Sequence, residues 1–203
     1  MADDIIEKNI RFFNFWAKTY DYGPIAWWLR GMQNAVLNQI KFSPGAKVLD
    51  IGCGTGRGLF FLLKKGFKNL FGIDLSPAMV QKSKNLLGKN AVIKLASVEK
   101  IPFARNTFDF VTNTEAFHHF PNPKNAVKEM YHVLKPNGRL YLADVNFFSQ
   151  TIHWLFKKLE PGHVKICSKK EFVDLFSQAG FKVIEQKRVY LFVILTVGEK
   201  LFE

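Results

Sequence analysis

The chain contains little cysteine and no long hydrophobic run. Its 203 residues include two cysteines, Cys53 and Cys167, which are far apart and lack the CxxC spacing of zinc sites. We therefore predict free thiols, without a disulfide framework or a structural metal. The longest late apolar run, YLFVILTV, is much shorter than the roughly 20 residues that a membrane-spanning helix requires.

A secretory signal is also missing from the first residues. The segment MADDIIEKN is acidic and has no apolar core, which favours a cytoplasmic location. Hydrophobic residues make up 48% and charged residues 23% of the chain, close to the average for soluble proteins. This composition and length predict one domain over residues 1–203.

Acidic residues are fewer than basic ones. The chain has 29 Lys and Arg against 17 Asp and Glu, a net charge of +12. The basic residues form scattered doublets such as Lys64-Lys65 and Lys169-Lys170, with no run of five or six. This scatter disfavours nucleic acid as a partner, and it leaves open an anionic acceptor or peripheral contact with a membrane. A monomer and a homodimer are both consistent with the sequence.

Apolar runs and helical periodicity alternate along the chain. Strands are predicted at residues 46–51, 69–74, 91–95, 108–113, 138–145, 181–186 and 189–197. Helices are predicted between them, ending at Gly66, Gly88, Leu134 and Gly180. Strands that alternate with helices indicate an α/β fold with a doubly wound, mostly parallel sheet, whose ligands bind beyond the carboxyl ends of the strands.

The segment VLDIGCGTGRG connects the first strand to its helix. Gly52, Gly54 and Gly56 allow the backbone to turn sharply and to approach a ligand closely, because they have no Cβ. The free N–H groups of the following helix favour an anionic group there. Asp74 ends the second strand about 20 residues later, where an acidic side chain accepts hydrogen bonds from ribose hydroxyls. The sequence therefore predicts a ligand that contains a nucleoside.

The glycine spacing narrows the choice of nucleoside. In the dinucleotide motif GxGxxG, counted from Gly52, the third glycine would fall on Arg57. NAD and FAD are therefore disfavoured. A P-loop is excluded because the turn contains no GxxxxGK[ST] sequence.

The pattern DxGxGxG, from Asp50 to Gly56, resembles the motif of class I S-adenosylmethionine-dependent methyltransferases. Further blocks resemble the small-molecule branch of this family, the ubiquinone and menaquinone biosynthesis type. They are GIDLSPAMV, IPFARNTFDFVTNTEAFHHF, MYHVLKPNGRLYLADV and SKKEFVDLFSQAGFKVIEQ, and together they span most of residues 45–188. The resemblance implies a Rossmann-like sheet of seven strands, the last antiparallel, and S-adenosyl-L-methionine as the cofactor.

The resemblance also implies the cofactor-binding residues. The methionine part would contact Asp50, directly or through water, and the turn containing Gly52, Cys53, Gly54 and Gly56. Asp74 would hold the ribose and Leu75 would pack on the adenine. Backbone groups at Ser97 and Val98 would read the adenine edge, where many relatives have an aspartate. Asn113 and Thr114 would face the sulfonium.

Candidate catalytic residues follow the fourth strand or precede the first. Methyl transfer from an activated donor requires mainly alignment, and a base is needed only if the acceptor must lose a proton. His118, His119 and Tyr20 are the leading candidates, with Glu115 and His163 as further ones. Packing or capping roles for the two adjacent histidines remain an alternative.

Aromatic residues are concentrated outside the predicted sheet. They occur within residues 12–28 and again from 147 to 156, where Phe147, Phe148, Trp154 and Phe156 lie. By resemblance, residues 1–44 form a helical cover over a core at 45–203, and an insertion near 146–167 shapes the acceptor side. The excess favours a small apolar or aromatic acceptor. An RNA methyltransferase and a non-catalytic S-adenosylmethionine-binding module remain alternatives.

Overall fold

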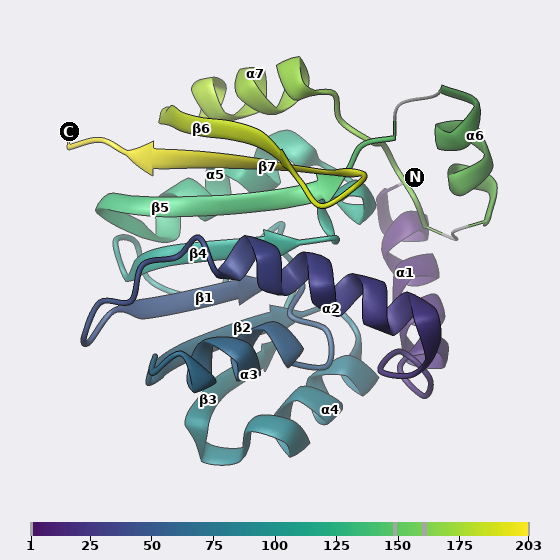
Figure 1. The fold of residues 1–203 in the computed structure, drawn as a ribbon, viewed down its shortest axis with the longest axis horizontal. Helices are drawn as coiled ribbons and strands as arrows, with labels where there is room; N and C mark the ends of the chain where they lie inside the picture. Colours follow the sequence, from purple (N-terminus) through teal and green to yellow (C-terminus); the bar gives the residue numbers. More distant parts are fainter. Residues whose placement is uncertain (1, 148–149, 160–161, 203) are drawn as a thin grey trace.

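A computed structural model describes residues 2–147, 150–159 and 162–202. Its strands form a seven-stranded sheet in the order β3-β2-β1-β4-β5-β7-β6 (Figure 1). The strands are β1 (Lys47–Ile51), β2 (Asn69–Asp74), β3 (Ala91–Leu95), β4 (Phe108–Thr114), β5 (Leu134–Val145), β6 (Phe181–Val189) and β7 (Val193–Lys200). Neighbouring strands from β3 to β5 pair in parallel. β7 lies antiparallel between β5 and β6, which confirms the predicted seven-stranded, mostly parallel α/β fold.

Helices cover both faces of the sheet (Figure 1). One core cluster joins the sheet to α2 (Gly23–Leu37), α3 (Arg57–Lys64) and α4 (Pro77–Leu87). A second cluster, on the other face, contains residues of α5 (Pro123–Val133) and α7 (Lys169–Ala179). The remaining helical segments are α1 (Ala2–Trp16), α6 (Gln150–Leu159) and the short 3₁₀ turns η1 (Gly88–Asn90) and η2 (Phe117–His119).

Local sequence signals explain where several helices begin and end. The Ser76 hydroxyl accepts a hydrogen bond from the Met79 N–H at the start of α4, and Pro77 occupies the first turn. Ser168 and Glu171 form the predicted capping box of α7. Gly180 ends that helix in the left-handed conformation, which glycine adopts without the penalty of a Cβ.

Several predicted boundaries are wrong: β5 begins at Leu134 and not at Gly138, β6 extends to Val189 and not to Gln186, and β7 runs from Val193 to Lys200. Leu134 is not part of the α5 face but the first residue of β5, opposite Phe108, because Pro136 lies too close for the helix to continue. The last strand does not begin at Val189, which ends β6. Residues 190–192 form the turn, with Tyr190 at φ +56°, and β7 begins at Val193.

The sheet topology brings several loops to one edge. Successive strands run outward from β1 to β3 on one side and from β4 to β5 on the other, so the chain changes direction between β1 and β4. The loops after β1, β2, β3 and β4 therefore meet at the carboxyl edge of the sheet, where ligands bind in such folds. In Figure 1, α1, α6 and the start of α2 lie at this same end.

Candidate functional site

The glycine turn after β1 forms one wall of a cavity at the carboxyl edge. Gly52, Gly54 and Gly56 have φ values of +69°, +53° and +84°, which side-chain-bearing residues rarely adopt. A Cβ on Gly52 would lie 2.7 Å from the Cβ of Ala116, so the turn fits tightly against the loop after β4. Gly52 and Gly54 line the cavity, and Gly56 lies behind it as the N-cap of α3.

Asp74 fastens the glycine turn to the loop after β2. Its Oδ2 accepts a hydrogen bond from the Gly54 N–H at 2.8 Å, and its Oδ1 accepts one from the Ser76 N–H at 2.9 Å. Burial raises the pKa of this carboxyl, and the two backbone donors oppose that rise. Each carboxylate oxygen retains a further lone pair, so Asp74 is able to accept ribose hydroxyls as well.

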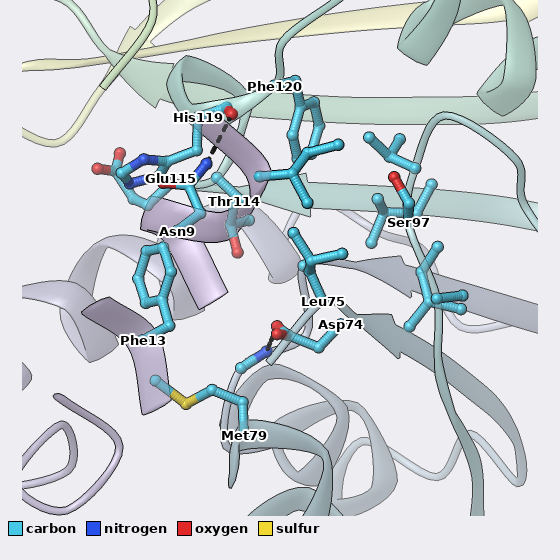
Figure 2. A pocket seen from close by; sticks show the side chains of 18 of the residues that line it. Asn9, Phe13, Asp74, Leu75, Met79, Ser97, Thr114, Glu115, His119 and Phe120 are labelled. Atoms are coloured by element: carbon cyan, nitrogen blue, oxygen red, sulfur yellow. Dashed lines mark hydrogen bonds between the residues drawn. The ribbon is translucent and has the colours of Figure 1, made fainter. Parts of the chain in front are cut away.

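The rest of this cavity is mostly apolar (Figure 2). Asp74, Leu75 and Ser97 lie on one side of it, and Phe13, Glu115 and His119 lie on the other. The predicted cofactor residues in its wall are Gly52, Gly54, Asp74, Leu75, Ser97, Val98 and Thr114, together with the candidate catalytic residues Tyr20 and His119. A glycine cradle, an acidic side chain and an apolar slot in one cavity fit the methionine, ribose and adenine parts of S-adenosylmethionine.

Besides Gly56, three predicted cofactor residues lie outside that wall, and so does the candidate catalytic residue His118. Asp50 is 2% exposed and accepts a 2.7 Å hydrogen bond from the Thr112 hydroxyl. The Asn113 amide donates to the Ile51 carbonyl at 2.7 Å and is fully buried. Cys53 lines a smaller neighbouring hollow. None of these side chains lines this first cavity, and the donor contacts expected for Asp50, directly or through water, and for Asn113 stay predictions.

The burial of Asp50 leads to a prediction about stability and pH. Burial raises its pKa from 3.8 to about 7, so the folded state binds a proton that the unfolded state releases. This difference in proton binding contributes to the stability of the folded state. The contribution is fully present below pH 3.8 and is lost as the pH rises through about 7. Asp50→Asn, which preserves the acceptor for Thr112, is expected to remove this loss.

Urea unfolding across pH 4–8 measures the effect. The free energy of unfolding of Asp50→Asn minus that of the wild type is expected to rise with pH, by on the order of 2–4 kcal/mol in total. Titrations that are common to both proteins cancel in this difference. A difference that does not change with pH would mean that Asp50 is ionised in the folded protein throughout the range.

A second cavity, of about 450 Å³, adjoins the first and is lined mainly by apolar side chains. We call it the apolar cavity. It lies between α1, α2, α6, η2, the end of β5 and the turn that precedes β7. Its lining residues are Phe13, Trp16, Tyr20, Ile25, Trp28, Leu29, Glu115, His118, His119, Val145, Phe147, Ile152, Leu155 and Phe192. Phe148 and the side chain of Phe156, also predicted on this side, lie outside the described residues.

Four residues line both cavities. They are Phe13, Tyr20, Glu115 and His119. The Phe13 ring packs edge-on against the His119 imidazole, with ring centroids 4.9 Å apart. The Asn9 amide donates a hydrogen bond to the His119 carbonyl at 3.1 Å. Helix α1 is thereby attached to η2 at the boundary between the two cavities. Glu115 has φ +56°, an uncommon conformation for a residue with a side chain, and such conformations concentrate at functional sites.

A buried histidine–aspartate pair lies beside this boundary. His118 Nδ1 is 2.5 Å from Asp144 Oδ1, and these two side chains are each 2% exposed. The Asp144 carboxylate accepts the Nδ1 proton, so Nε2 is the basic nitrogen of the neutral ring. His163 stacks on His118 with ring centroids 5.1 Å apart, which brings the predicted candidates His118, His119 and His163 together.

Some residues of the site could not be recognised in the sequence. Asp144 reads as the end of a strand, although a polar residue at the carboxyl end of an apolar strand is itself a signal of a site. Ile6, Asn9 and Met79 also line the first cavity. Gln33, from α2, donates to the Thr114 hydroxyl at 3.0 Å. Helix periodicity alone does not indicate that α1 and α2 reach the ends of the strands.

Comparisons with known proteins agree with this geometry. A family described as "Methyltransferase domain" matches residues 49–142. The chain is 26% identical to 2-methyl-6-phytyl-1,4-hydroquinone methyltransferase 1 of Oryza sativa over 88% of its own length and 54% of the relative's. It is 28% identical to the ubiquinone/menaquinone biosynthesis C-methyltransferase of Geotalea daltonii, over 65% of its own length and 61% of the relative's.

A similar fold occurs in a Haloferax volcanii protein that was solved in complex with the Trm112 methyltransferase activator. The TM-score is 0.83 at 22% identity, and the match covers 94% of this chain and 98% of the other. The curated relatives are longer, since the chain spans between about half and three fifths of their lengths. The sheet order, the glycine turn and these matches together identify the chain as a member of the class I S-adenosylmethionine-dependent methyltransferases, a family whose cofactor is S-adenosyl-L-methionine.

Proposed function

We propose that the protein transfers a methyl group from S-adenosylmethionine to a small acceptor with an apolar or aromatic body. The observation that carries this proposal is the contact between the two cavities. The first has the polar and apolar groups that the donor requires, the second is apolar, and Phe13, Tyr20, Glu115 and His119 line both. A donor and an acceptor bound side by side would meet at these four residues.

The donor is assigned to the first cavity. Asp74 would accept hydrogen bonds from the ribose hydroxyls, while Leu75 and Val98 would contact the adenine. The turn at Gly52 and Gly54 would hold the methionine part against the backbone. When bound, S-adenosylmethionine supplies a methyl group on a positively charged sulfur, which is already activated for displacement. The chain therefore has to align the two reactants and exclude water, tasks that can provide much of a rate acceleration.

The acceptor is assigned to the apolar cavity. The side chains around it are mostly aromatic or aliphatic, and their burial against an apolar acceptor is favourable by about 25 cal/mol per Å². The hydroquinone named for the Oryza sativa relative is an aromatic ring with a phytyl chain. An aromatic ring with an apolar tail is the acceptor that best matches this lining. In this assignment, residues 1–44 form the cover and the segment near 146–167 completes the acceptor side.

Proton removal is assigned to the histidine–aspartate pair. A hydroxylated ring becomes a better nucleophile as it loses its proton, and a neutral imidazole accepts protons near pH 7. Asp144 accepts the Nδ1 proton of His118 and thereby orients its ring. His119 and Tyr20, at the boundary between the cavities, would position the acceptor and shield the methyl group from water.

The two alternatives make different predictions. An RNA methyltransferase would need room for a nucleotide and neighbouring phosphate contacts, which a cavity of about 450 Å³ lined by rings and aliphatic chains does not favour. A non-catalytic module would bind the donor and transfer nothing. Donor binding alone therefore cannot distinguish this last alternative from an enzyme.

Methyl transfer tests the proposal directly. Purified protein, methyl-labelled S-adenosylmethionine and a series of hydroquinones of increasing tail length would be incubated in detergent, with tRNA as a parallel substrate. We expect label in a hydroquinone product that is one methyl group heavier, and little label in tRNA. Transfer to tRNA alone would support the first alternative. Tight donor binding without transfer to any substrate would support the second.

A substitution at Asp74 tests the donor assignment separately. Asp74→Ala removes the proposed ribose acceptor and the bond to the Gly54 N–H, and we expect a loss of donor affinity of about ten- to a hundredfold. Titration calorimetry with S-adenosylhomocysteine measures this loss. Asp109→Ala is the matched control, because Asp109 lies near the start of β4, outside the first cavity. Its carboxylate accepts hydrogen bonds from the Lys47 N–H and the Lys135 ammonium. If Asp74→Ala and Asp109→Ala bound S-adenosylhomocysteine with equal affinity, the assignment of Asp74 to the donor site would be wrong.

A further inference from the structure

Exposed apolar side chains surround the mouth of the apolar cavity. Ile25, Ile152 and Leu155 line this cavity, and they are also 63%, 44% and 49% exposed. Trp27 and Tyr190 line an adjoining surface hollow, and Trp27 is 79% exposed. Leu191, the next residue of the β6–β7 turn, is 67% exposed. We call these residues, Ile25, Trp27, Ile152, Leu155, Tyr190 and Leu191, the apolar rim.

The apolar rim is built from three segments that are distant in the sequence. They are α2, α6 and the turn at residues 190–192, and Figure 1 places α6, this turn and the start of α2 at the same end of the sheet. Large apolar residues gathered on one face are unusual for a surface that contacts only water, and such patches mark interaction sites. The patch leads into a cavity, so whatever covers it also faces the cavity mouth.

The charge of these segments is of one sign. α2, α6 and residues 190–192 contain no aspartate or glutamate, and α6 presents the exposed lysine Lys158. The Lys158 ammonium lies 3.9 Å from the centroid of the Trp154 ring. Lysine and arginine beside exposed tryptophan and aliphatic side chains are typical of surfaces that bind anionic membranes. A second copy of the chain docked through the same surface would place its lysine near this one, so the charge favours an anionic bilayer over a homodimer contact.

We propose that the apolar rim docks the protein on an anionic phospholipid bilayer, with Trp27 and Leu191 entering the interfacial region. Among the described residues, no helix is long and apolar enough to span a membrane, so this contact is peripheral. The docking itself does not require the proposed function. The consequence of docking for catalysis does rest on the proposed function: an acceptor with a lipid tail would pass from the bilayer into the apolar cavity without crossing water.

Sedimentation with lipid vesicles tests the docking. Wild-type protein is expected to sediment with vesicles that contain phosphatidylglycerol, and much less with phosphatidylcholine alone or at high salt. The double variant Trp27→Ser/Leu191→Ser changes two rim residues outside the apolar cavity wall and is expected to weaken binding at least about tenfold. Phe202→Ser is the matched control: Phe202 is 74% exposed, near the C-terminus at the opposite end of the sheet (Figure 1).

The outcomes separate docking from catalysis. Binding by the double variant equal to that of the wild type, or no binding by the wild type, would overturn the proposal. A wild-type dimer that the double variant dissociates, without vesicle binding, would instead identify the rim as a contact between copies. Transfer to a short-chain hydroquinone in solution is expected to be unchanged in the double variant. Wild-type protein that binds vesicles but methylates nothing would leave the docking intact and refute the proposed function.

Discussion

His118→Asn is expected to lower turnover of a hydroquinone acceptor by on the order of 100- to 10,000-fold at neutral pH. Asparagine is close in size to the inner part of the ring, and its amide is able to donate to Asp144, but it cannot accept the acceptor's proton. Because His118 lines the apolar cavity and not the first cavity, the affinity for S-adenosylhomocysteine is expected to stay within about twofold. Single-turnover rates and calorimetry measure the two quantities.

Two further variants make this result specific. His132→Asn changes a histidine of α5, outside both cavities, and is expected to leave turnover unchanged. Asp144→Asn preserves the shape of the pair but weakens the orientation of the His118 ring, and it is expected to shift the pH dependence of turnover as well as its rate. Turnover by His118→Asn within a few-fold of the wild type would mean that no base acts at this position.

Gly52→Ala is expected to reduce donor affinity by a hundredfold or more, which corresponds to about 2.7 kcal/mol. The new Cβ would lie 2.7 Å from the Ala116 Cβ, and the φ of +69° is unfavourable for alanine. The turn or the loop after β4 must therefore move, and both line the first cavity. The free energy of unfolding is also expected to fall, by about 1–3 kcal/mol.

Gly45→Ala separates the crowding at Gly52 from backbone strain. Gly45 has a similar φ, +78°, but its added Cβ would meet no atom within 4 Å. Urea unfolding of both variants is expected to show a smaller loss of stability in Gly45→Ala, and calorimetry an unchanged donor affinity. If Gly52→Ala bound S-adenosylhomocysteine as tightly as Gly45→Ala does, the inference that the turn closely approaches the donor would be wrong.

The fold was largely predictable because its signals are local. Apolar strands alternate with helices whose caps, such as Ser76 and Ser168, are visible in the sequence. The errors lie where two local preferences compete. Leu134 continues the apolar face of α5, but the proline two residues later ends the helix and the strand takes this residue. Val189 continues an apolar run, although the turn that follows it separates two strands.

The site was less predictable, because it depends on directions and on distant contacts. Asn113 and Thr114 were both expected to face the donor, yet successive residues of a strand point to opposite sides, and only Thr114 lines the cavity. Asp144 meets His118 across 26 residues of sequence. The walls contributed by α1 and α2 arise from tertiary packing, which hydrophobic periodicity does not specify.

A crystal structure with S-adenosylhomocysteine and a prenylated hydroquinone would test the arrangement of the two cavities most directly. We expect the ribose on Asp74, the sulfur near Tyr20 and Glu115, and the hydroquinone ring in the apolar cavity within reach of His118. The sulfur and the ring would then face each other across the boundary between the cavities. Density for the nucleoside in the apolar cavity, or for the hydroquinone outside it, would contradict this arrangement.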